Sequence, residues 1–188
     1  MKMMKVAVLA AAMSALPAMA DGFGSIEYNF RDGYGDNDGT RVNGYSLNLG
    51  TYLTETTSVD ISSKFRQDNT TSDTNTRLEV GLTQYVPLTS WLKLYGRGGV
   101  GTRFDNNDDF NYFSVEGGAV VPLSQNWSVK VGYRYRDSME QDIEYQTDTI
   151  RTSLTYAVSK NASLFLGYDR YSGDTNVNGV NLGYAFKF

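Results

Sequence analysis

The chain ends in the stretch Val180-Asn181-Leu182-Gly183-Tyr184-Ala185-Phe186-Lys187-Phe188. Its even-numbered positions hold Val, Leu, Tyr, Phe and Phe, whereas its odd-numbered positions hold Asn, Gly, Ala and Lys. Alternation with a period of two predicts a β-strand with one apolar face and one polar or small face. At the open edge of a soluble sheet such a strand would invite aggregation, whereas in a closed membrane barrel its backbone is paired and its apolar face meets lipid. The stretch therefore favours a transmembrane β-barrel.

A last strand that alternates apolar residues and ends in Phe resembles the closing strand of Gram-negative outer-membrane β-barrel proteins. The likeness rests on residues 180–188 and on the pattern of the whole chain. In that family the closing strand is read by the barrel-assembly machinery. The resemblance therefore implies a location in the outer membrane and an assembly signal made of Tyr184, Phe186 and Phe188.

Residues 1–20 have the three parts of a secretory signal peptide. Lys2 and Lys5 supply the positive start, residues 6–16 are apolar apart from one Ser, and Ala18-Met19-Ala20 fits the cleavage site. The apolar run is shorter than the roughly 20 residues that a membrane-spanning helix needs. We therefore expect export, with residues 21–188 forming the mature β-barrel as one domain.

The composition agrees with an exported β-barrel. The chain has no Cys and no His, but it has 14 Tyr and 19 Gly, and its formal net charge is −4. The absence of Cys excludes a disulfide framework and thiolate chemistry. No apolar run after residue 20 is long enough for a transmembrane helix.

Period-two alternation predicts ten antiparallel strands, each about as long as a tilted membrane strand. The predicted strands are 23–31, 42–53, 58–66, 77–86, 91–104, 112–121, 127–136, 149–158, 162–170 and 180–188. Eight or twelve strands would result if one hairpin were divided differently.

The connections between these strands alternate between short and long. The short ones are 54–57, 87–90, 122–126 and 159–161, and the longer, more polar ones are 32–40, 67–76, 105–109, 137–147 and 171–177. Val86-Pro87-Leu88-Thr89 and Val121-Pro122-Leu123-Ser124 repeat one local pattern. In membrane barrels short turns face the periplasm and long loops face outside, so an even strand number places both termini in the periplasm.

A soluble sandwich or lipocalin-like barrel is the competing fold, and it would place the apolar face inside. Two features favour the membrane barrel. Arg and Lys occupy central positions of the polar face but hardly any of the apolar face. Aromatic residues gather near strand ends, as interface girdles do. They are Phe30, Phe65, Phe104, Tyr135 and Tyr168 at one end, and Trp127, Tyr156, Phe186 and Phe188 at the other.

If the apolar face meets lipid, the polar face lines the lumen and makes it basic. We predict as pore-lining residues Lys64, Arg66, Lys93, Arg97, Glu116, Lys130, Arg134, Arg136 and Arg151. The same face carries the further cations Arg77, Arg103 and Lys187, and the further acids Glu27, Asp60, Glu79 and Asp169. The loops, in contrast, are rich in Asp and Glu. The negative net charge therefore conceals a basic interior and an acidic rim.

Two interpretations of this interior remain open. Its charges could pair across strands and plug a lumen, since eight strands leave room only for side chains whereas about 16 enclose a water channel. Alternatively, the surplus guanidinium groups could form a track for small acidic solutes. Residues 130–136, Lys-Val-Gly-Tyr-Arg-Tyr-Arg, resemble strands of the acidic-oligosaccharide porins, which have Arg-rich lumens but about twelve strands.

The sequence gives little support for catalysis. Outer-membrane barrel enzymes of known families use a His, which this chain lacks, and a Ser nucleophile needs a partner base. A Lys–Ser pair with Lys93 or Lys130 is the remaining option, and an ion pair explains either lysine as well. We predict no enzyme, no cofactor, no metal site and no nucleic-acid partner.

We therefore expect a monomeric outer-membrane barrel in contact with lipid and lipopolysaccharide, acting as a narrow passive pore. Its weak preference for small anionic solutes would be set by Arg97, Arg134, Arg136 and Arg151. The alternative is a structural or surface-interaction barrel with a plugged lumen.

Overall fold

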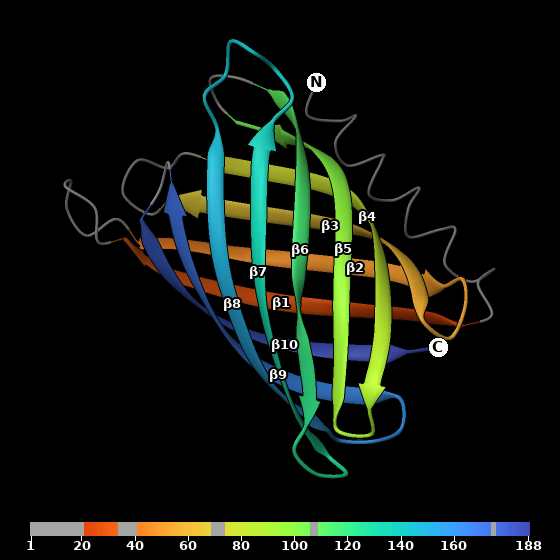
Figure 1. Cartoon of the computed structure of the whole chain (residues 1–188). Helices are drawn as coiled ribbons and strands as arrows, with labels where there is room; N and C mark the ends of the chain where they lie inside the picture. Colours follow the sequence, from red (N-terminus) through yellow and green to blue (C-terminus); the bar gives the residue numbers. More distant parts are fainter. Residues whose placement is uncertain (1–20, 34–40, 69–73, 106–108, 174–175) are drawn as a thin grey trace.

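A computed structural model describes residues 21–33, 41–68, 74–105, 109–173 and 176–188, so the predicted signal peptide lies outside the described residues. The chain forms a closed, antiparallel, up-and-down barrel of ten strands (Figure 1). The strands are β1 (Gly22–Gly33), β2 (Arg41–Tyr52), β3 (Thr57–Asp68), β4 (Thr74–Thr89), β5 (Leu92–Phe104), β6 (Phe110–Pro122), β7 (Trp127–Ser138), β8 (Gln146–Ala157), β9 (Ala162–Gly173) and β10 (Val177–Lys187). The prediction of ten strands is confirmed, and most strands extend further toward the loops than the alternation indicates.

The C-terminal strand closes the barrel against the N-terminal strand. β10 pairs with β1 along its whole length, with Tyr184 opposite Ile26 and Val180 opposite Phe30. Reciprocal backbone hydrogen bonds of 2.9 and 3.0 Å join Gly22 and Phe188. The apolar last strand therefore has no free edge.

Three of the four short turns share one backbone design. In each, the amide nitrogen of the first turn residue donates to the carbonyl oxygen four residues later: Leu53 to Thr57, Leu123 to Trp127, and Val158 to Ala162. A Ser or Thr hydroxyl at the next position accepts a hydrogen bond from the backbone nitrogen two residues on, in Thr54, Ser124 and Ser159. This is a local turn motif of Ser and Thr side chains, and it explains the recurring hairpin pattern.

The fourth short turn differs from the prediction. Residues 87–89 belong to β4 rather than to the turn, and the register with β5 shifts between Pro87 and Thr89. Proline has no backbone N–H to give to the ladder, so the strand accommodates it at an irregularity near its end. Only Ser90 and Trp91 then remain to connect β4 with β5.

The two faces of the wall have opposite chemistry. Large apolar side chains point outward, for example Val80 and Leu182, which are 47% and 60% exposed. Asp60, Glu79 and Glu116 are buried inside. This arrangement is the reverse of a soluble barrel and matches a lipid-facing exterior with a polar lumen.

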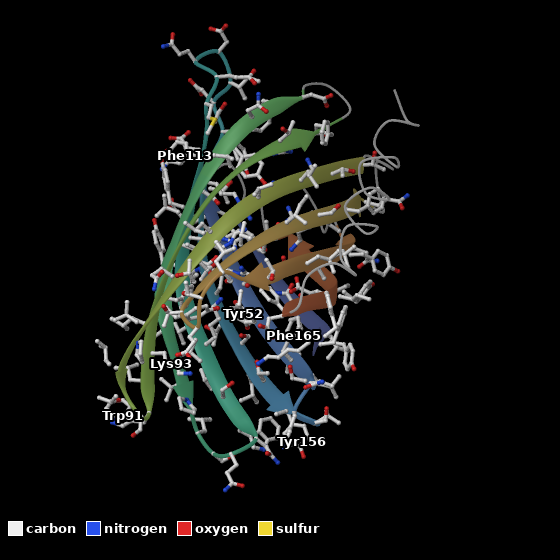
Figure 2. The ribbon with its side chains drawn as sticks, turned by 90° about the vertical axis from the view of Figure 1, so that its right-hand side faces the viewer. Tyr52, Trp91, Lys93, Phe113, Tyr156 and Phe165 are labelled. Carbon is white, nitrogen blue, oxygen red and sulfur yellow. The ribbon has the colours of Figure 1, made fainter. Side chains whose placement is uncertain are left out.

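Aromatic side chains lie at both ends of the outer surface. Trp91 and Tyr156 lie near the short-turn end and Phe113 near the loop end (Figure 2). The rings of Trp127 and Tyr156 lie 4.7 Å apart, and those of Phe113 and Tyr135 lie 6.0 Å apart. Among the described residues no helix is long and apolar enough to cross a membrane.

Candidate functional site

The barrel encloses a cavity of about 330 Å³ lined by inward-facing side chains of strands all around the wall. Its lining extends from Phe23 and Phe165 toward the short-turn end to Tyr112 and Tyr171 toward the loop end. Because successive residues of a strand alternate between lumen and lipid, each strand contributes every second side chain. Every basic residue predicted to line the pore, apart from Arg66 and Lys93, lines this cavity.

Arg97 on β5 forms the first ion-pair group of the lumen. Its Nη2 lies 2.8 Å from Oδ2 of Asp60 on β3, and its Nε lies 3.2 Å from Oδ1 of the same carboxylate. Its Nη1 also pairs with Glu79 on β4. The guanidinium lies over Gly81, where a Cβ atom would come within 2.6 Å of the Arg97 Nε. The glycine therefore makes room for an arginine that joins three strands.

Glu116 on β6 is the centre of a second group, and it is 2% exposed. One carboxylate oxygen accepts hydrogen bonds from Arg134 Nε at 2.5 Å and Arg151 Nη1 at 3.4 Å. The other accepts from the Tyr95 hydroxyl at 2.8 Å and lies 3.7 Å from Lys130 Nζ. One buried carboxylate thus holds three cations, which is a geometry that compensates the cost of desolvating the carboxylate.

Two further contacts extend these groups around the lumen. Arg151 Nε lies 3.3 Å from Oδ1 of Asp169 on β9. Arg136 Nε on β7 lies 3.4 Å from Oε2 of Glu79 on β4, and the Tyr112 hydroxyl donates to the same oxygen at 3.0 Å. β4 and β7 are not adjacent strands, so the contact between Arg136 and Glu79 narrows the lumen.

The remaining predicted pore residues make contacts of other kinds. Lys64 Nζ lies 3.7 Å from Glu27 and donates to Asn29 Oδ1 at 2.5 Å. The buried guanidinium of Arg66 lies 5.8 Å from the centre of the Tyr171 ring. Lys93 is exposed near the short-turn end, close to Trp91 (Figure 2). The structure therefore brings together Arg97, Glu116, Lys130, Arg134, Arg136 and Arg151, but not Lys93.

A second cluster lies toward the loop end, and we call it the loop-end cluster: Arg77, Arg103, Phe110, Tyr112 and Tyr145. The Arg77 and Arg103 guanidinium groups lie 5.5 and 5.3 Å from the centre of the Tyr145 ring. Phe110 and Tyr112 pack on that ring, with centroids 5.0 and 6.3 Å away. Arg103 pairs with Asp105 at 2.6 Å.

Tyr145 belongs to the connection between β7 and β8 and reports the electrostatics of this cluster. Its side chain is 5% exposed. Burial raises the pKa of the phenol, but the guanidinium groups of Arg77 and Arg136, a hydrogen bond with Thr147 and the guanidinium group of Arg103 together lower the pKa to about 8. The charged groups closest to the Tyr145 ring among the described residues are therefore cations.

The sequence alone does not single out this cluster. Arg77 and Arg103 lie on the predicted inward face but not among the predicted pore-lining residues, and Tyr145 lies in a predicted loop. Alternation shows which face a side chain occupies, but it does not show which residues of neighbouring strands are opposite each other. The sequence offers one signal for Tyr145: it is an aromatic residue near the end of the predicted loop 137–147, shortly before the predicted strand 149–158.

The predicted assembly signal lies on the lipid side of the barrel. The rings of Tyr184 and Phe186 lie 6.1 Å apart, and those of Phe186 and Phe188 lie 6.0 Å apart. Tyr184 and Phe188 are 44% and 45% exposed. Their recognition by the assembly machinery stays a prediction.

Comparisons with known proteins concern the whole barrel. The family model described as "Outer membrane protein beta-barrel domain" matches residues 6–188. No curated protein matches the chain.

Among solved structures, the chain is similar to the KdgM porin in complex with disordered oligogalacturonate, with 13% identity and a TM-score of 0.47 over 87% of this chain and 99% of that chain. The NanC porin gives 12% identity and a TM-score of 0.49 over 89% of this chain and 99% of that chain. The translocator domain of the autotransporter NalP from Neisseria meningitidis gives 8% identity and a TM-score of 0.48 over 98% of this chain and 95% of that chain. Likeness at this level says nothing about what this chain carries or binds.

Proposed function

The chain belongs to the outer-membrane β-barrel protein family, and we propose that it is a narrow passive pore whose basic lumen favours small anionic solutes. The observation that carries this proposal is the cavity of about 330 Å³ within the barrel, lined mainly by polar and charged side chains. Such a lining suits a hydrated solute.

The charge balance of the lumen supports a preference for anions. The joined ion-pair groups contain five cations, Arg97, Lys130, Arg134, Arg136 and Arg151, around four carboxylates, Asp60, Glu79, Glu116 and Asp169. Arg77 adds a further positive charge toward the loop end, and no carboxylate of the described residues pairs with it. A positive lumen with low-dielectric walls concentrates anions and repels cations.

The ion pairs also refine the roles of the four arginines that the sequence singles out. Arg97, Arg134, Arg136 and Arg151 each contact at least one carboxylate. A paired guanidinium contributes less to the potential felt by a solute than an unpaired one. We therefore propose that these four arginines shape the path, while the surplus charge of the whole lumen gives the preference.

The dimensions support a low conductance. Ten strands lie between the eight that leave only side-chain space and the 16 of water-filled porins. The contact between Arg136 and Glu79 joins strands that are not neighbours. A solute would have to pass beside this contact, so large oligomers are not expected to cross.

The same contact favours a second candidate, a structural or surface-interaction barrel with a plugged lumen. In that case the ion pairs serve stability, and function resides in the acidic loops. In either case we propose that the monomer contacts lipid and lipopolysaccharide and that the assembly machinery recognises its last strand.

Single-channel currents of the refolded protein in a planar bilayer would separate the two candidates. Discrete current steps and a reversal potential of anionic sign in a salt gradient would support the pore. Arg151→Gln should reduce the preference without disrupting the lumen, because Arg134 and Lys130 still neutralise Glu116. Lys93→Gln removes the same charge outside the network and serves as the control. A silent bilayer from correctly folded protein would eliminate the pore and leave the plugged barrel.

A further inference from the structure

Three cations of neighbouring strands lie directly opposite one another in the lumen wall. Lys64 on β3 is paired in register with Arg77 on β4, and Arg77 is paired with Arg103 on β5. Like charges in directly opposite positions destabilise a sheet. A row of this kind is expected only where negative charge is available to it.

Lys64 and Arg103, the two outer cations of the row, each have a carboxylate nearby. Lys64 lies beside Glu27, and Arg103 pairs with Asp105 at 2.6 Å. Arg77, between them, has none: within the described ranges no carboxylate pairs with it and no hydrogen bond reaches it. Arg77 is 7% exposed, and its buried Nε has no partner. An unpaired buried cation is costly, and proteins seldom retain one without a counter-charge.

Arg77 lies between an aromatic ring and the lumen cavity. One side is covered by the Tyr145 ring, 5.5 Å from the guanidinium carbon, and Arg77 lines the cavity described above. The guanidinium carbon of the neighbouring Arg136 lies 5.7 Å from the centre of the Tyr112 ring, and Arg136 shares the carboxylate of Glu79 with Arg97. The lowered pKa of Tyr145 reports the same excess of positive charge.

We propose that Arg77, flanked by Arg103 and Arg136, binds a compact oxoanion: a carboxylate, phosphate or sulfate group of a solute in the lumen. A guanidinium recognises such a group through two parallel hydrogen bonds. The anion would come from a free solute rather than from a lipid headgroup, because the Arg77 side chain faces the inside of the barrel. The inference deepens the proposed pore function and rests on it, since the solute must enter the lumen.

Inorganic phosphate is a suitable probe, titrated against chloride at constant ionic strength into the refolded protein in detergent. Phosphate should raise the midpoint of thermal unfolding. It should also raise the pKa of Tyr145, measured at 295 nm as the difference between the wild type and Tyr145→Phe. In Arg77→Gln the apparent affinity for phosphate should fall at least tenfold. In Lys93→Gln, which loses one exposed lumen-end cation, the affinity should be unchanged.

A second variant keeps the test decisive should Arg77→Gln fold poorly. Arg77→Glu places a carboxylate between Lys64 and Arg103, so it should fold with a higher midpoint than the wild type and no longer respond to phosphate. An equal phosphate response in the wild type and in either Arg77 variant, or no response in the wild type, would overturn the site.

The outcomes for site and pore are distinguishable. Phosphate binding by a protein that gives no current would leave the Arg77 site in place and contradict the pore. Anion-selective currents from a protein without a phosphate response would support the pore and contradict the Arg77 site.

Discussion

The middle of the lumen and its loop end hold similar arginines in different electrostatic settings. In the middle, Glu116 and Glu79 each contact at least two cations. At the loop end, Arg77 lies between two further cations and contacts the Tyr145 ring, and no carboxylate of the described residues pairs with it. Ion pairs therefore link the strands in the middle of the lumen, whereas at the loop end the proposed anion would supply the negative charge that Arg77 lacks.

The largest effect should come from removing the central carboxylate. Glu116→Gln removes the carboxylate that Lys130, Arg134 and Arg151 share, while Asp169 still pairs with Arg151, so we expect a loss of roughly 3–5 kcal/mol in the free energy of unfolding. Denaturant titration of the refolded barrel measures it. Glu144→Gln, in the exposed connection before β8, is the control and should match the wild type. A loss of stability well below this range in Glu116→Gln would show that the ion pairs around Glu116 contribute little to the stability of the barrel.

A methyl group placed under Arg97 should have the next largest effect. In Gly81→Ala the new Cβ would meet the Arg97 Nε at 2.6 Å, and displacing this guanidinium from Asp60 and Glu79 should cost roughly 1–3 kcal/mol. Gly98→Ala is the matched control, because its Cβ would point outward with nothing within 4 Å. Equal stability of the two variants would contradict the tight packing of the Arg97 group.

The free energy of unfolding should depend on pH through the ionisation of Tyr145 at the loop end. The pKa of Tyr145 is about 8 in the folded barrel and about 10 in the unfolded chain. An acid with a lowered pKa stabilises the fold when it is ionised. The contribution, of order 2 kcal/mol, is therefore fully present above pH 10 and is lost as the pH falls through 8. The stability difference between the wild type and Tyr145→Phe should rise from pH 8 to 10, and a flat difference would contradict the positive cluster.

The smallest effect, opposite in sign to that of Glu116→Gln, is expected at Arg77. In chloride without other anions, Arg77→Gln should raise the free energy of unfolding by about 0.2–1 kcal/mol, because it removes like charges opposite each other on β3, β4 and β5. Denaturant titration against the wild type measures it. Destabilisation would mean that Arg77 is already satisfied within the barrel.

The fold was predictable from the sequence because the alternation of side chains is a local property. Ten strands, the lipid face and the pairing of β10 with β1 follow from that pattern and from closure of the barrel. The turn before β5 was placed too early, since β4 continues past Pro87 by shifting its register.

The sequence predicts which charged residues face the lumen, but not which of them pair with one another. The inward face of Arg97, Arg134 and Arg151 follows from alternation, but their carboxylate partners depend on the register between strands. The position of Tyr145 depends on how the β7–β8 connection pairs, with the Ser138 nitrogen donating to the Tyr145 carbonyl oxygen at 3.0 Å. The sequence pattern fixes neither of these, so the distinction between a paired middle and an unpaired loop end became visible only in the structure.

The most direct test of the account compares reversal potentials of Arg77→Gln and Arg151→Gln with that of the wild type, in planar bilayers under one salt gradient. Both variants lose one positive charge, but Arg151 is neutralised by Asp169 and Glu116 whereas Arg77 is not. We predict that Arg77→Gln loses more of the anion preference than Arg151→Gln. A larger loss in Arg151→Gln, or a preference that neither variant changes, would contradict it.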